Sequence, residues 1–278
     1  MKSLAELQAI KDKMKSKVVM REGSTDTRFV VGIGGSATND AGTGMLQALG
    51  FKFLDREGKT LGHGGKTLID IAHIDQSQVH PSLKNAHFIV ACDVRNPFYG
   101  PEGAAFVFAR QKGADDAMIA QLDKGMRSFA DVIQQETGKD ISQVPGSGAA
   151  GGLGGGMLAL LNAELKSGAD LLLEYSHFEK HLANADLIIT GEGSIDRQSL
   201  MGKIPGKILQ IAQKHQVPVI AIAGIAKDMD LLKKAGFSEI YTTKPDSMPL
   251  DEAMKPGIAI QNIKRTVLSI FQTSVSFD

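Results

Sequence analysis

Short apolar runs alternate with helical patterns along the C-terminal part of the sequence, and this alternation limits the fold more than any other feature. The series runs 187–189 (strand), 204–214 (helix), 218–224 (strand), 228–235 (helix), 239–243 (strand) and about 251–271 (helix). Strands separated by helices pair in parallel, and the helices cover both faces of the sheet. We therefore predict an α/β chain that ends in a parallel, Rossmann-like sheet.

A glycine turn follows the first β-prone apolar run, residues 29–31. Gly32, Gly34 and Gly35 come next, and apolar residues recur at helical spacing from Ala41 onward, which predicts a strand, a turn and a helix. Glycine lets a backbone turn sharply and approach a ligand closely, and the start of a helix attracts anionic oxygens. The same turn carries polar side chains, namely those of Ser36, Thr38, Asn39 and Asp40.

Two interpretations of this turn remain open. The spacing Gly32-x-Gly34-x-x-Ala37, with Asp55 at the end of a second strand-like run, fits the fingerprint of a dinucleotide-binding oxidoreductase. A fixed carboxylate at Asp40 would repel a pyrophosphate unless a metal ion lay between them. The second interpretation is structural, with Ser36 or Asn39 capping the helix.

Composition excludes several function classes. The 278 residues contain 31 acidic and 31 basic side chains, so no net charge favours nucleic acid or an anionic membrane. Cys92 is the single cysteine, which rules out a disulfide framework or a cysteine-based metal site within one chain. No secretory signal pattern or membrane-spanning apolar run is present, so we expect a cytoplasmic protein.

Further polar residues follow a buried-type strand over residues 87–93. Asp93 ends this strand and Asn96 follows it, at the place where α/β proteins position ligand-binding groups. Asp93 is a candidate metal ligand or general base, and a simple turn is the alternative. Residues 105–109, AFVFA, predict a short strand, and Lys112 in the polar loop after it is a candidate phosphate ligand. An amphipathic helix is predicted over 115–137.

Two later segments complete the candidate site. Residues 145–156, PGSGAAGGLGGG, predict a packed glycine loop at the active site rather than a flexible linker, and a helix is predicted over 157–165. Residues 190–193, TGEG, predict a turn after the strand at 187–189. The polar side chains of this second segment are those of Glu192, Asp196, Ser199 and Lys203. Acidic groups and a lysine beside a strand end favour magnesium–nucleotide chemistry over hydride transfer.

Five motifs in order resemble those of bacterial glycerate kinases of the glycerate 2-kinase type. They are GIGGSATND (32–40), ACDVRNP (91–97), QKGA (111–114), SGAAGGLG (147–154) and TGEGSID (190–196). The resemblance extends from about residue 29 to the C-terminal helix. It implies phosphorylation of D-glycerate by ATP with Mg²⁺, giving 2-phosphoglycerate, and two α/β domains with a cleft between them. One domain would be Rossmann-like and the other rich in glycine.

The sequence departs from the family pattern at its N-terminal side. Family members begin with PDSFKGS-like and ADGGEGT-like motifs, and neither is present, so we expect a Rossmann-like sheet incomplete at that side. Residues 1–28 form a leader with a predicted helix over 2–20, which resembles, weakly, the start of thioredoxin-like two-iron ferredoxin subunits. The expected domains are 1–28, 29–182 (glycine-rich, substrate) and 183–278 (Rossmann-like). Smaller departures are Ala41 for a glycine, Ala109-Arg110 for Gly-Pro and Ser194 for an arginine.

The resemblance leads to a kinase hypothesis with named residues. The catalytic candidates are Asp40, Asp93 and Asp196, and Asp93 and Asp196 are also candidate Mg²⁺ ligands. The expected substrate or phosphate contacts are Gly34, Gly35, Ser36, Thr38, Asn39, Asn96, Lys112, Glu192 and Lys203. A catalytically impaired remnant, or half of a split kinase, is the alternative. We also expect the uncovered sheet to form a homo-oligomer or to bind a partner fragment encoded upstream.

Overall fold

The structure is a computed structural model that describes residues 27–273. The predicted helix over residues 2–20 lies outside this part of the chain. The described chain forms two compact units, and the boundary between them lies between Gly168 and Ala169. Each unit has its own hydrophobic core. These units reflect packing alone, so the expected boundary at residue 182 and the roles assigned to the domains remain predictions.

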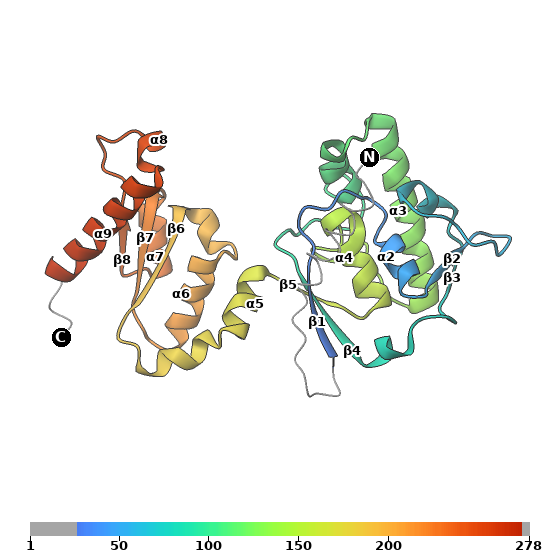
Figure 1. The fold of residues 1–278 in the computed structure, drawn as a ribbon, viewed down its shortest axis with the longest axis horizontal. Helices are drawn as coiled ribbons and strands as arrows, with labels where there is room; N and C mark the ends of the chain where they lie inside the picture. Colours follow the sequence, from blue (N-terminus) through green and yellow to red (C-terminus); the bar gives the residue numbers. More distant parts are fainter. Residues whose placement is uncertain (1–26, 274–278) are drawn as a thin grey trace. The chain divides into compact units, whose positions relative to one another are not determined.

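The first unit contains one parallel sheet and one small antiparallel sheet. Its elements are β1 (Thr27–Gly32), α2 (Thr43–Ala48), β2 (Lys52–Leu54), η1 (Gly65–Asp70), β3 (His73–Asp75), η2 (Pro81–Asn85), β4 (Ala86–Ala91), η3 (Ala105–Ala109), η4 (Arg110–Lys112), α3 (Asp116–Thr137), α4 (Ala149–Leu160) and β5 (Glu164–Lys166). The parallel sheet has the order β1-β4-β5, and β2 pairs only with β3. Figure 1 shows the long helix α3 beside α4.

Register brings the carboxyl ends of β1 and β4 to the same edge of this sheet. Gly32 is paired with Ala91, so the glycine turn and the Asp93 segment leave the sheet together. The core beneath is formed by α3, α4 and the β2–β3 hairpin, where the rings of Phe53 and Phe129 meet edge to face at 5.6 Å. The helix predicted over 115–137 is confirmed as α3, and Asp115 caps it by accepting a hydrogen bond from the Met118 N–H.

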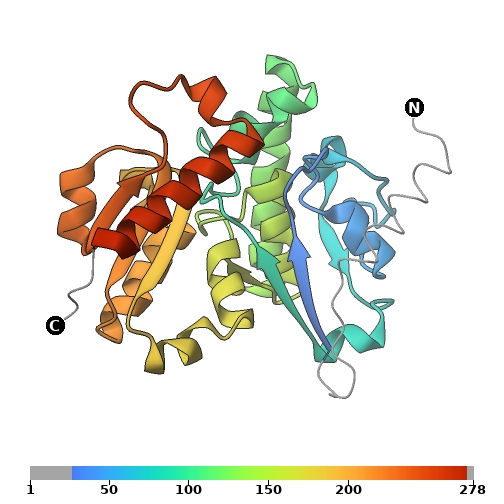
Figure 2. The same cartoon turned by 60° about the vertical axis from the view of Figure 1, so that its left-hand side comes forward.

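The second unit is a three-stranded parallel sheet with helices on both faces. Its elements are α5 (Gly168–Tyr175), η5 (Phe178–Asn184), β6 (Ile188–Ile195), η6 (Arg197–Leu200), α6 (Ile204–Lys214), β7 (Val219–Ala226), α7 (Met229–Ala235), β8 (Glu239–Thr242), α8 (Leu250–Ala253) and α9 (Pro256–Thr273). The order is β6-β7-β8, and all pairs are parallel. Within this unit, α9 lies against one face and α6 against the opposite face (Figures 1 and 2). The predicted α/β class is confirmed.

The predicted strand over 105–109 is wrong, because this segment is the π-helix η3. Its residues are β-prone, but the ones that are buried follow helical spacing. Ala105 and Ala109 are fully buried, whereas Phe106 and Val107 are 48% and 44% exposed. Burial of small residues four apart on one side overrides the local β-propensity.

Three other boundaries differ from the prediction. The TGEG segment does not turn, because β6 continues to Ile195 and pairs with β7 along this length. A Cβ on Gly191 would lie 2.3 Å from the Ile222 carbonyl oxygen, so the close pairing of the two strands requires glycine at this position. The helix expected over 157–165 ends at Leu160, and its last residues form β5. The C-terminal helix is divided into α8 and α9 just before Pro256, which cannot continue a preceding helix.

Candidate active site

The glycine turn after β1 forms one wall of a cavity in the first unit. The cavity has a volume of about 290 Å³ and opens at the carboxyl ends of β1 and β4. Gly35 has a φ of +70°, a conformation that favours glycine, and no atom lies within 4 Å of where a Cβ would be on Gly34 or Gly35. The lining residues are Ile33, Gly34, Gly35, Ser36, Ala91, Cys92, Asp93, Val94, Phe108, Gln111, Lys112, Ala149 and Ala150.

Lys112, the last residue of η4, connects this short helix to the glycine turn. Its Nζ donates to the backbone oxygen of Thr38 at 2.6 Å and to Ser36 Oγ at 3.0 Å. Burial lowers the pKa of Lys112 from the ordinary lysine value, and the nearby carboxylate of Asp40 partly opposes this shift. The ammonium group thus lies in the cavity wall, where an anionic ligand would favour its charged form.

The Asp93 carboxylate is the acidic group of this cavity. It follows β4 and is exposed, and its Oδ1 accepts a hydrogen bond from the backbone N–H of Gly168 at 2.8 Å. Asn96 is placed differently, because its Nδ2 donates to the Glu102 backbone oxygen at 2.8 Å and it does not line the cavity. The backbone carbonyl oxygen of Asn96 accepts hydrogen bonds from the backbone N–H groups of Gly146 and Gly148. Asn96 therefore fastens the loop after β4 to the glycine-rich segment.

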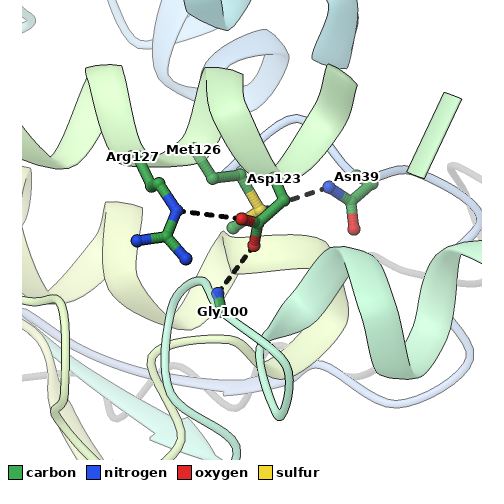
Figure 3. Close-up of polar contacts among 5 residues, drawn as sticks. All are labelled: Asn39, Gly100, Asp123, Met126 and Arg127. Atoms are coloured by element: carbon green, nitrogen blue, oxygen red, sulfur yellow. Dashed lines mark hydrogen bonds and ion pairs between the residues drawn. The ribbon is translucent and has the colours of Figure 1, made fainter. Parts of the chain in front are cut away.

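Asn39 and Asp40 lie buried beneath the turn and do not line this cavity. Asp40 Oδ1 accepts a hydrogen bond from the N–H of Gly42 at 3.2 Å. Asn39 Nδ2 donates to the Met126 sulfur at 3.3 Å (Figure 3). The Asn39 Oδ1 atom has no hydrogen-bond partner among the described residues, which is unusual for a buried amide oxygen. The helix α2 begins only at Thr43, so neither side chain stands at its first residues.

A buried carboxylate on α3, Asp123, fixes the loop that follows Asn96, and the sequence analysis missed it. Asp123 Oδ1 accepts from the N–H of Gly100 at 2.6 Å, and Oδ2 accepts from Arg127 Nε at 2.9 Å (Figure 3). The Arg127 guanidinium lies 4.4 Å from the centre of the Tyr99 ring. Because Asp123 and Met126 lie on the same helix, α3 holds both this loop and Asn39.

The glycine-rich segment packs directly on the backbone of the site, and α4 is kinked within it, because Ala150, Gly151 and Gly152 have positive φ values. A Cβ on Gly151 would lie 2.1 Å from the Thr38 carbonyl oxygen, and one on Gly156 would lie 2.1 Å from the Ala41 carbonyl oxygen. The N–H of Ala41 donates to the Gly151 oxygen at 3.0 Å. Ala41, which replaces a family glycine, has a φ of +55°. The predicted close packing of this segment is confirmed; residues 150–152 are not helical, whereas the residues from Leu153 onward continue α4 as a regular helix.

The candidates of the second unit form a separate polar group at the end of β6. Ser199 Oγ donates to Glu192 Oε1, and Lys203 Nζ lies 3.9 Å from Glu192 Oε2. Asp196 is the N-cap of η6, because its carboxylate accepts from the Gln198 N–H at 2.8 Å. This capping role of Asp196 was not predicted from the sequence. It does not exclude a ligand on the remaining carboxylate oxygen.

The described side chains do not form a metal site made by the protein alone. Across residues 27–273, no group of three or more His, Cys, Asp or Glu side chains converges in a way that could hold a metal ion. Mg²⁺, however, often takes only one or two protein carboxylates and completes its shell with water and phosphate oxygens. The single exposed carboxylate of Asp93 fits that mode. Asp93 and Asp196 belong to different units, so their joint role as ligands remains a prediction.

The fold argues against the dinucleotide interpretation of Gly32, Gly34 and Ala37. That fingerprint requires a helix to start within the motif and a parallel second strand that ends in the acidic residue. Here α2 starts at Thr43, and β2 lies in a different sheet from β1. Asp55 accepts hydrogen bonds from the N–H groups of two residues in its own turn. The fingerprint is therefore matched in sequence but not in structure.

Comparisons with known proteins agree with the motif series. The glycerate kinase family matches residues 16–274, beginning inside the segment assigned to the leader. Similar proteins are the glycerate kinase of Halalkalibacterium halodurans (44% identity over 231 residues, covering 83% of this chain and 61% of that protein) and the glycerate 2-kinase of Escherichia coli K12 (43% over 248 residues, 89% and 65%). A crystal structure described as a "putative glycerate kinase 2" from Salmonella typhimurium LT2 has a TM-score of 0.71 and 38% identity, covering 88% of this chain and 65% of that one.

This chain thus spans 61% to 65% of the length of these relatives. The family match extends over most of the sequence and includes both compact units. The chain therefore belongs to the glycerate kinase family.

Proposed function

We propose that this chain carries the phosphoryl-transfer site of a glycerate kinase, with ATP as donor, D-glycerate as acceptor and 2-phosphoglycerate as product. The observation that carries the proposal is the cavity at the ends of β1 and β4. It combines glycine backbone, a hydroxyl at Ser36, a cation at Lys112 and a carboxylate at Asp93. Phosphoryl transfer depends mainly on positioning and charge neutralisation, and this set of groups supplies both.

The roles follow from the position of each group. Lys112 and the N–H groups of the turn at Gly34 and Gly35 would bind anionic oxygens, with Ser36 donating a further hydrogen bond. Asp93 would accept the proton of the attacking hydroxyl or bind Mg²⁺, which neutralises phosphate charge when bound. Asp93 is favoured as base over Asp40, since Asp40 is buried beneath the turn and already bonded to Gly42.

The second unit would supply the remaining contacts. Glu192, Asp196 and Lys203 lie together at the end of β6, and they remain proposed phosphate or metal contacts. Thr38, Asn39 and Asn96 remain proposed substrate contacts, although the last two have side-chain partners within the protein. No helix among residues 27–273 is both long and apolar enough to cross a membrane, and a cytoplasmic location remains a prediction.

The test is a coupled assay of ADP release with D-glycerate and Mg·ATP. We expect Asp93→Asn to reduce the rate at least about a hundredfold, as loss of a general base does. Asp40→Asn and Asp196→Asn complete the series, and Asp186→Asn, at an exposed position, is the matched control. If all three site variants keep the rate of the control, the assignment of the aspartates is wrong.

A second candidate function is binding without turnover, by a catalytically impaired kinase or half of a split one. The cavity at the ends of β1 and β4 can bind an anion whether or not turnover follows, and the chain spans 61% to 65% of the relatives' length. A ligand at a hundred times its Kd stabilises a protein by about 2.7 kcal/mol, which raises the Tm measurably. Stabilisation by ATP and glycerate without ADP release would support this candidate, whereas turnover would exclude it.

We further propose that the second unit associates through its sheet, with another copy of the chain or a separately encoded fragment. Within the described chain, β6 has a strand neighbour on one side only, and Ile189 on it is 43% exposed. An open strand edge with apolar side chains favours pairing with another strand. Light scattering at several concentrations would test this. A monodisperse monomer that binds no dye for exposed apolar surface would contradict it.

A further inference from the structure

A second cavity lies in the first unit beside the candidate active site and is not explained by it. Its volume is about 390 Å³, and it is bordered by the start of α3, the start of η1, residues 37–39 and residues 109–114, which include η4. The residues that matter for its chemistry are Asn39, Lys66, Lys112, Met118, Gln121 and Leu122. This volume lies within the range typical of pockets for small organic ligands.

One wall of the second cavity is apolar and accessible. Met118 and Leu122 are four residues apart on α3, so their side chains lie on the same face of the helix. Met118 is 52% exposed although it is a large apolar residue. A flexible methionine beside a leucine gives an adaptable surface for a flat aromatic group.

Lys112 lines both cavities and therefore connects them. Its Nζ is held at the glycine turn by Ser36 Oγ and the Thr38 carbonyl oxygen. A ligand with an anionic part and an aromatic part could place the first at Lys112 and the second against Met118. Nucleotides have this division of chemistry.

Asn39 adds a polar group that can distinguish bases. It lines the second cavity, it is 8% exposed, and its Oδ1 has no hydrogen-bond partner among the described residues. Its Nδ2 is held only by the weak acceptor sulfur of Met126 (Figure 3). A buried acceptor without a donor is unfavourable. The Oδ1 atom is itself covered, so a rotation of the Asn39 side chain toward the cavity would be needed for it to accept a hydrogen bond from an amino group on a bound base.

We propose that the second cavity binds the adenine base of the nucleotide, with Met118 and Leu122 against the ring and Asn39 accepting a hydrogen bond from the amino group. The inference rests on the proposed function, because it assigns the base of the same ATP whose phosphates would reach Lys112. It makes Asn39 a specificity residue for the base rather than a contact of the phosphates.

The first experiment compares ATP with tripolyphosphate by isothermal titration calorimetry of the full chain with Mg²⁺. Met118→Ser removes an exposed apolar contact, and Met254→Ser, at a position that is 71% exposed in the second unit, is the control. We expect Met118→Ser to weaken ATP binding about fivefold, with tripolyphosphate binding unchanged. Equal ATP affinity in Met118→Ser and the control would overturn the base site.

The second experiment replaces the amino group of the base. ITP carries an oxygen where ATP has the amino group, so it would place one acceptor against another. We expect the parent chain to bind ITP at least about tenfold more weakly than ATP, and Asn39→Leu to reduce this difference. Equal binding of ITP and ATP by the parent overturns the role of Asn39. A parent chain that binds neither ATP nor tripolyphosphate refutes the proposed function itself, which separates the two failures.

Discussion

The contact between α4 and the site turn can be measured by adding a single methyl group. Gly151 has a φ of +71°, and a Cβ there would lie 2.1 Å from the Thr38 carbonyl oxygen and 2.7 Å from the Asn39 Cα. Gly138 has nearly the same φ, +73°, with no atom within 4 Å of its Cβ position. Gly138→Ala is thus a matched control, since the backbone strain and the effect on the unfolded chain are alike.

The difference between the two variants isolates the steric cost. A left-handed alanine costs about 1–2 kcal/mol at either position. At Gly151 the backbone of residues 38 and 39 must also move, and overpacking of this kind costs about 1–3 kcal/mol more. We therefore expect Gly151→Ala to lower the free energy of unfolding by about 2–5 kcal/mol, against about 1–2 kcal/mol for Gly138→Ala.

Urea denaturation followed by circular dichroism measures both values on the full chain. An unchanged m-value would show that stability alone has altered. Because the chain has two compact units, the transition of the first unit is identified as the one that Gly138→Ala also shifts. An ordinary surface substitution changes the free energy of unfolding by about 0.5 kcal/mol or less. If the free energies of unfolding of the two variants differ by no more than this, the packing of α4 on the turn is not as described.

The remaining predictions concern two charged groups. Asp123→Ala should lower the free energy of unfolding by about 2–4 kcal/mol, since it leaves the Gly100 N–H without its acceptor. Asp123→Asn should cost roughly half as much, because the amide oxygen keeps that acceptor. Equal urea midpoints for the two variants would contradict this. Burial lowers the pKa of Lys112 from 10.5, so its charge is lost at a lower pH than that of an exposed lysine, and ATP affinity should fall as the pH rises through that lowered pKa. Lys112→Arg should keep its affinity over the same pH window in calorimetric titrations, and a parallel fall in both proteins would assign the titration to another group.

Much of the fold could be predicted from local patterns, because those patterns carry the physical cause. The apolar runs at β1, β4, β6 and β7 form parallel strands, and the amphipathic pattern over 115–137 forms α3. Residues 105–109 show the limit of this reasoning. Their β-branched and aromatic content indicates a strand, but the small residues that face the core decide the structure.

The candidate site was predictable where a residue binds through its own chemistry, and not where it acts through a distant partner. Lys112 and Asp93 line the cavity as their position after apolar segments suggests. Asp123 could not be assigned from sequence, because its partner is the N–H of Gly100, 23 residues away, and a backbone N–H leaves no mark in the sequence. The orphaned oxygen of Asn39 is likewise a property of packing alone.

The composition of α4 has a consequence for the order in which the first unit folds. Five of its twelve residues are glycine: Gly151 and Gly152 have positive φ and interrupt the right-handed helix, and each of the other three costs about 1 kcal/mol in a helix relative to alanine. Such a segment does not hold a helical conformation by itself, so it can become helical only against loops that are already close to their final places. We therefore expect α4 to be absent from the folding nucleus and to form together with the glycine turn, late in folding, so that the cavity is completed in one cooperative step.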